Sequence, residues 1–163
     1  METTIFTELG LFWAFLGAAV AATMGAIGSS VGSGLTGQAA TGLAAEKPEL
    51  GMKAIILQAL PGSQAIYGFV ALFFVLFIVL EVDADGKSVV ITSAQGFQIL
   101  AACIPVGISG YFSGLFQGKV LAGAMNMLAK DEGTFANAMI MGAIVETFAI
   151  LGLLGSILML LKI

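Results

Sequence analysis

Four long apolar segments restrict the fold of this chain more than any other feature of its sequence. They cover residues 10–45, 50–80, 95–129 and 134–161. Each is longer than the ~20 residues that a helix needs to cross a hydrocarbon core of about 30 Å. Barrel strands are much shorter, and lipid offers no partner to an unpaired backbone group, so helix is the predicted spanning form. We expect an all-α integral membrane protein with four transmembrane helices.

The connections between the apolar segments predict how the helices pair. Residues 46–49 and 130–133 are short and charged, whereas residues 81–88 form a longer acidic loop. Short connections join antiparallel neighbours. We therefore expect two antiparallel helical hairpins, residues 1–85 and 86–163.

Composition excludes most soluble-enzyme chemistry. The chain is 59% hydrophobic and 10% charged, with a mean hydropathy of +1.06, which is outside the range of water-soluble globular domains. It has no histidine and a single cysteine, Cys103, so disulfides, structural zinc and histidine-activated nucleophiles are unsupported. Glu2 and Glu8 precede the first apolar segment without a lysine or arginine, which is unlike a cleaved signal peptide. Residues 32–37 match G-x-G-x-x-G, but they lie inside an apolar segment with no preceding strand, so we expect no nucleotide site.

The lysines predict an orientation in the membrane. The chain has six lysines and no arginine. Lys47, Lys53, Lys119 and Lys130 lie in or near the two hairpin turns, whereas Lys87 and Lys162 lie toward the other side with five of the ten acidic residues. The positive-inside rule then predicts cytoplasmic hairpin turns and external termini.

The two halves of the chain resemble each other. A shift of about 82 to 84 residues superimposes the charged turns and places Gln64 opposite Glu146. Duplication is the simplest interpretation. Because the carboxylate of the second half is an amide in the first, we expect only one titratable site within the membrane.

Glu146 is the carboxylate that carries the functional hypothesis. About a dozen uncharged residues flank it on either side, and a charge at that depth costs a few kcal/mol, so such residues are usually functional and paired. Counting from the predicted turns, Gln64, Gln117 and Glu146 lie roughly 18–21 Å from the same boundary. We expect these three side chains to share one layer.

The second apolar segment contributes further oxygens to this layer. Leu60, Ser63, Gln64 and Tyr67 follow i, i+3, i+4, i+7 spacing and share one helix face. Pro61 cannot donate to the carbonyl of Leu57 and should distort that turn. Carboxylate, amide, hydroxyl and carbonyl oxygens suit a hard cation, and one carboxylate balances one Na⁺. A proton remains an alternative, as do hydrogen bonds in which the buried polar groups merely satisfy one another.

The glycine pattern bears on assembly. Gly110, Gly114 and Gly118 form one small-residue face, and Gly28 with Gly32 forms another. Such faces permit close approach of membrane helices. If both glycine-rich helices line the inside of a closed ring, the second and fourth helices lie outside and carry Gln64 and Glu146.

Residues 60–69, 112–120 and 145–152 resemble the rotor-ring proteolipids of V-type ATPases, most closely the bacterial sodium-pumping kind. The resemblance covers nearly the whole chain. It implies a Na⁺ site formed by the Leu60 carbonyl, Ser63, Gln64, Gln117 and Glu146, with Tyr67 as the hydrogen-bond partner of the carboxylate. Ser63 stands where the family often has threonine, and Phe148 where it commonly has tyrosine.

The resemblance also implies a setting. Identical chains would form a lipid-embedded ring in a bacterial plasma membrane, with central-stalk subunits on its cytoplasmic side and no role for nucleic acid. A stator membrane subunit would supply the arginine that this chain lacks, and other subunits would hydrolyse ATP, so the chain itself is expected to be non-catalytic. Proton translocation by the same ring is the first alternative. A small four-helix cation-coupled exporter and a structural pore are two others, and an intact transport activity in Glu146→Gln would favour the pore.

Overall fold

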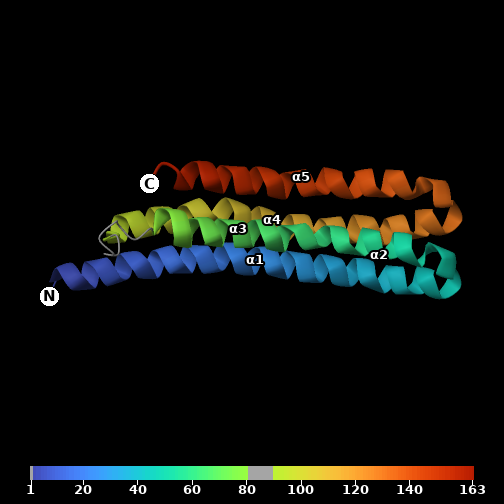
Figure 1. Cartoon of the computed structure of the whole chain (residues 1–163), viewed down its shortest axis with the longest axis horizontal. Coiled ribbons are helices and arrows are strands. Elements are labelled where there is room, and N and C mark those ends of the chain that lie inside the picture. The colour runs from blue at the N-terminus through green and yellow to red at the C-terminus, as the bar shows by residue number, and fades with distance from the viewer. Residues whose placement is uncertain (1, 81–89) are drawn as a thin grey trace.

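The computed structural model describes residues 2–80 and 90–163, with side chains from residue 9 onward, and this part is helical except for short connections. Its α-helices are α1 (Glu2–Glu46), α2 (Gly51–Ala59), α3 (Ser63–Phe74), α4 (Ser93–Lys130) and α5 (Phe135–Leu160). They run side by side, with the hairpin turns at one end and both termini toward the other (Figure 1). Within the described residues, four helical segments are long and apolar enough to span a membrane, so the four predicted segments are confirmed: Leu9–Glu46, Pro48–Val79, Ser93–Lys130 and Glu132–Leu160.

The second span is built from several pieces rather than one regular helix. A 3₁₀ turn, η1 (Pro48–Leu50), leads into α2, and a second, η2 (Leu60–Gly62), separates α2 from α3. A π-helical turn, η3 (Val75–Val79), ends the span. Pro61 lies inside η2, where its missing N–H and its ring prevent a regular α-helical turn. The distortion predicted at Pro61 is therefore present.

α4 is a single long helix despite its internal proline. It starts with a capping box in which Thr92 and Gln95 satisfy each other's backbone N–H groups. Pro105 does not end the helix. One residue later, the N–H of Val106 donates to Ser156 Oγ on α5 at 3.0 Å, so a neighbouring helix provides an acceptor beside the proline.

The glycine-rich helices α1 and α4 pack directly against each other. A Cβ added to Gly114 would lie 2.5 Å from the carbonyl carbon of Gly28, and one added to Gly118 would lie 2.4 Å from Cα of Gly32. The hydroxyl of Thr36 on α1 donates to the carbonyl of Gly118 at 3.2 Å. Thr36 and Gly118 are separated by 82 residues, as are Gly28 and Gly110, whose backbones also meet. Equivalent residues of the two halves thus lie side by side in parallel helices.

The remaining helices cover this pair from outside. α3 packs on α1, and α5 packs on α4, while α3 and α5 meet each other over a shorter stretch. α5 exposes large apolar side chains along its length. Ile144, Phe148 and Leu151, for example, are 59%, 63% and 62% exposed. Such a surface requires lipid or another protein around it. The chain is a multi-pass membrane protein.

The two hairpin turns are tied together at one end of the molecule. Lys47 Nζ donates to the carbonyl of Ala129 at 2.6 Å, near the C-terminus of α4. Lys53 pairs with Glu132 at the other turn. The acidic loop and the predicted boundary between the two hairpins, near residues 85 and 86, lie outside the described residues.

Candidate intramembrane ion site

Glu146 lies on α5, in the middle of the membrane-spanning part of the molecule. It stands 11 residues after Phe135, the first residue of α5, or roughly 17 Å along the helix axis. Its side chain is half-buried. Tyr67 Oη donates to Glu146 Oε1 at 2.6 Å, and Gln117 Nε2 lies 3.4 Å from Glu146 Oε2. The carboxylate is therefore held between α3 and α4.

Gln64 and Gln117 are fully buried polar side chains next to Glu146. Neither side chain has any exposed surface. Gln64 Nε2 donates to Gln117 Oε1 at 2.8 Å, and Gln117 Nε2 donates to the carbonyl of Gly142 at 3.0 Å. The structure therefore brings together the three side chains for which the sequence predicts a common depth.

Ser113 is a member of the network that the sequence interpretation missed. Its hydroxyl accepts from Gln64 Nε2 at 3.2 Å and donates to the carbonyl of Val145 at 2.9 Å. The residue thus connects α3 with α5 from a position on α4. Its spacing was an available signal, because Ser113 is four residues before Gln117 and shares its helix face.

Leu60 and Ser63 complete the set of predicted oxygens. Ser63 Oγ donates to the carbonyl of Leu60 at 3.1 Å, so the two oxygens are adjacent at the irregular turn η2. Leu60, Ser63 and Glu146 line one open groove, whose other walls are apolar side chains of α2 and α3. All six predicted site residues therefore lie in or beside one layer that spans α3, α4 and α5.

One buried acceptor in this layer has no partner. Gln64 Oε1 is fully buried and accepts no hydrogen bond from the described residues. The hydrogen-bond network assigns this orientation: the Gly142 carbonyl can only accept, so Gln117 directs Nε2 to it and Oε1 to Gln64, whose Nε2 then donates. An unpartnered buried oxygen is costly, and a cation ligand is one way to satisfy it.

Charge gives a second reason to consider a cation. Among the residues whose side chains are described, the one salt bridge joins Lys53 to Glu132 at the hairpin turns. Glu146 has no lysine partner within that part of the chain. An ionised carboxylate within a bilayer is expensive without a compensating charge. One monovalent cation beside Glu146 would remove that cost.

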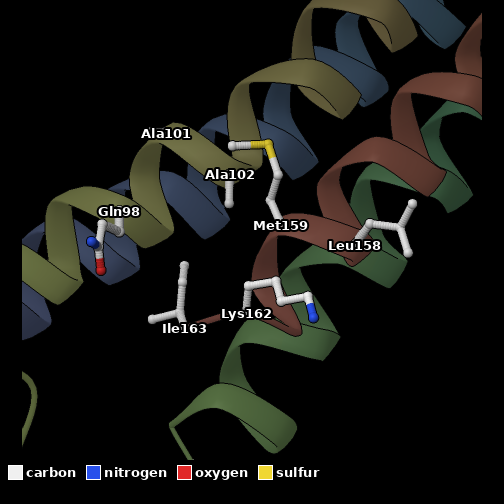
Figure 2. A pocket seen from close by; sticks show the side chains of 7 residues that line it. All are labelled: Gln98, Ala101, Ala102, Leu158, Met159, Lys162 and Ile163. Atoms are coloured by element: carbon white, nitrogen blue, oxygen red, sulfur yellow. The ribbon is translucent and has the colours of Figure 1, made fainter.

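A separate pocket lies between the N-terminal part of α4 and the C-terminal end of α5. Figure 2 shows Gln98, Ala101 and Ala102 on one side of it, with Leu158, Met159 and the C-terminal residues Lys162 and Ile163 on the other. Met159 is 13 residues beyond Glu146, or roughly 20 Å along the helix. This pocket therefore does not belong to the carboxylate layer.

The sequence of this chain is similar to those of several known proteins. The family model for the ATP synthase C subunit matches the chain twice, over residues 16–75 and 100–159. The chain is 42% identical to the V-type sodium ATPase subunit K of Enterococcus hirae over 162 residues, which cover 99% of each chain. It is 32% identical to the A-type ATP synthase subunit K of Methanocaldococcus jannaschii over 148 residues, or 91% of this chain and 61% of the relative.

A proton-ATPase relative is more distant. The chain is 29% identical to the 16 kDa proteolipid of the V-type proton ATPase of Rattus norvegicus, over 90% of each chain. One family match falls on each half of the chain. These are the same halves that the sequence repeat relates and whose helices α1 and α4 pack side by side. The chain belongs to the family of the ATP synthase C subunit, as a duplicated form in which each half carries the family hairpin.

Proposed function

We propose that this chain is the rotor-ring subunit of a rotary V-type ATPase and carries one Na⁺ at Glu146 as the ring turns. The proposal depends on the layer around Glu146, in which the described residues offer neither a cationic partner to the carboxylate nor a hydrogen-bond donor to the buried Gln64 Oε1. The name of the Enterococcus relative, a V-type sodium ATPase subunit, supports Na⁺ as the cargo.

The proposed ligands are neutral oxygens around a single negative charge. They are the Leu60 carbonyl, Ser63 Oγ, Gln64 Oε1, Gln117 Oε1 and the Glu146 carboxylate. Oxygen ligands of this kind suit a hard cation, and a monovalent ion leaves the occupied site neutral. A divalent ion would leave a positive charge exposed to lipid. Tyr67 would hold one carboxylate oxygen while the other faces the ion.

The half-buried position of Glu146 suits exchange of the ion. In the proposed cycle the neutral, loaded site passes through the lipid, and an arginine of a stator subunit displaces the ion where the ring meets it. The ring would consist of identical chains in a bacterial plasma membrane, with hairpin turns and central-stalk subunits on the cytoplasmic side. ATP hydrolysis would occur in other subunits. The two hairpins, residues 1–85 and 86–163, would be the two copies of the duplicated unit.

The test is the rate at which a carbodiimide labels Glu146 in the purified, assembled protein at fixed pH and ionic strength. Such reagents attack the protonated carboxyl group, so a bound cation slows labelling. We expect Na⁺, but not K⁺ or choline, to protect Glu146, and Gln64→Ala and Gln117→Ala to lose this protection. Labelling that is rapid and indifferent to Na⁺ would instead support proton translocation. The family assignment favours either ion over a four-helix exporter or a structural pore.

A further inference from the structure

Ser29 lies on α1, which packs against α3 and α4. It contacts the start of α3, directly after the turn η2, where several proposed ligands lie. Its hydroxyl is buried, with 6% of the residue exposed. Ser29 Oγ accepts a hydrogen bond from the backbone N–H of Ala65 at 2.8 Å. In a regular helix that N–H is directed at the carbonyl four residues earlier, which here belongs to Pro61. A backbone donor next to the irregular turn η2 is therefore bonded to a different helix.

Two glycines bring α1 close enough for this bond. A Cβ added to Gly25 would lie 2.5 Å from the carbonyl oxygen of Gln64, and one added to Gly32 would lie 2.9 Å from Cβ of Pro61. Gly25, Ser29 and Gly32 follow i, i+4, i+7 spacing and so share one face of α1. That face contacts the chain from Pro61 to Ala65. Ser29 is the residue on it whose side chain bonds the turn.

We infer that Ser29 is a positioning residue for the ion site. It does not touch the ion; by holding Ala65, it fixes the segment from Leu60 to Gln64, which carries the proposed carbonyl, hydroxyl and amide ligands. The inference rests on the proposed function. The affinity of an oxygen site for a small cation, and its preference among cations of different size, change when the ligands move by a few tenths of an ångström. The helix α1 therefore influences Na⁺ affinity and selectivity although no ligand lies on it.

The test uses Ser29→Ala in the assembled, full-length protein. Carbodiimide labelling of Glu146 is followed while Na⁺, and separately Li⁺, is titrated. We expect the half-protecting Na⁺ concentration to rise about five- to tenfold, the size associated with losing one hydrogen bond of ordinary net strength. The ratio of the half-protecting Li⁺ and Na⁺ concentrations should change as well.

The matched control is Ser30→Ala. Ser30 is adjacent on α1, but it is exposed and bonds the carbonyl of Ile27 in its own helix. It should leave the titrations unchanged. If Ser29→Ala does not accumulate in the membrane, Ser29→Cys replaces it, because a thiol has nearly the same volume and is a weak acceptor. It should change Na⁺ protection in the same direction.

A general structural role predicts a different result. A variant that loosened the whole layer would alter labelling without Na⁺, and its dependence on pH, because the Tyr67 bond to Glu146 would also change. Ser29→Ala should leave both as in the parent protein. Unchanged half-protecting Na⁺, or altered labelling without Na⁺, would overturn the positioning role. Absence of Na⁺ protection in the parent protein would instead overturn the proposed function.

Discussion

Tyr67 and Glu146 come from different hairpins, so their 2.6 Å hydrogen bond joins the two halves of the chain at the carboxylate. Hydrogen bonds to charged groups contribute about 1.5–3 kcal/mol, more than neutral ones. The bond orients one carboxylate oxygen, and Gln117 approaches the other. The site is one charge surrounded by neutral donors and acceptors, and those that are side chains can each be replaced by a side chain of similar shape.

Replacing Tyr67 tests this description. Tyr67→Phe keeps the ring and removes the hydroxyl that donates to Glu146. We expect the half-protecting Na⁺ concentration to rise about tenfold or more, since a bond of that strength orients the carboxylate. Titration of carbodiimide labelling with Na⁺ measures the effect. The control is Tyr111→Phe at the chain's other tyrosine, and equal titrations for both variants would contradict the role given to Tyr67.

The sequence predicted the members of the layer better than their connections. Equal depth along the helices was enough to group Gln64, Gln117 and Glu146, because helix rise is constant. Spacing places Ser113 on the same helix face as Gln117, but not its bonds to α3 and α5. Ser29 bonds a backbone group of another helix, and the rotation of one helix against another is not contained in single-helix spacing. Ser29 was visible in the sequence only as a small residue on a glycine-rich face.

At the scale of elements, the tight contact between α1 and α4 depends on glycine. Backbones approach there so closely that an added Cβ at Gly114 has no space, since it would lie 2.5 Å from the carbonyl carbon of Gly28. Both helices also carry site-forming contacts on the same faces: α1 holds the turn at Pro61, and α4 contributes Gln117. The packing of this pair therefore determines the geometry of the layer around Glu146.

Gly114→Ala should disrupt that pair. Overpacking a well-packed interior costs about 1–3 kcal/mol, and here the obstacle is backbone, which cannot rotate away. We expect a lower midpoint of thermal unfolding for the purified protein, together with weaker Na⁺ protection of Glu146. The matched control on α4 is Gly123→Ala, where an added Cβ meets nothing within 4 Å. An equal loss of stability in both variants would show that helix contact at Gly114 is not responsible.

The boundaries of the elements were predicted less well than their existence. Periodicity and length identified four apolar helices, but the second is divided by 3₁₀ and π-helical turns that hydropathy does not register. α4 begins at Ser93 rather than near residue 95, because the capping box at Thr92 fixes its start. Pro61 was the sequence signal for the break beside the ion layer, and the structure confirms it.

In the whole molecule the family hairpin occurs twice, but only one of the two carries a carboxylate at the depth of the proposed site. The residue equivalent to Glu146 in the first half is Gln64, which is fully buried and serves the single site as a donor to Gln117. The internal repeat and its register were readable from the sequence, since the shift of 82 residues reappears between α1 and α4. Ring formation depends on surfaces between copies and remains a proposal.

The most direct test of the proposed site is the number of Na⁺ ions bound per chain. Radioactive Na⁺ would be equilibrated with the purified, assembled protein at a concentration well above that needed for protection. We predict one ion per chain for the parent protein and none for Glu146→Gln, which keeps the shape of the side chain and removes its charge. No bound Na⁺ in the parent protein, or the same stoichiometry in Glu146→Gln, would contradict a Na⁺ site at Glu146.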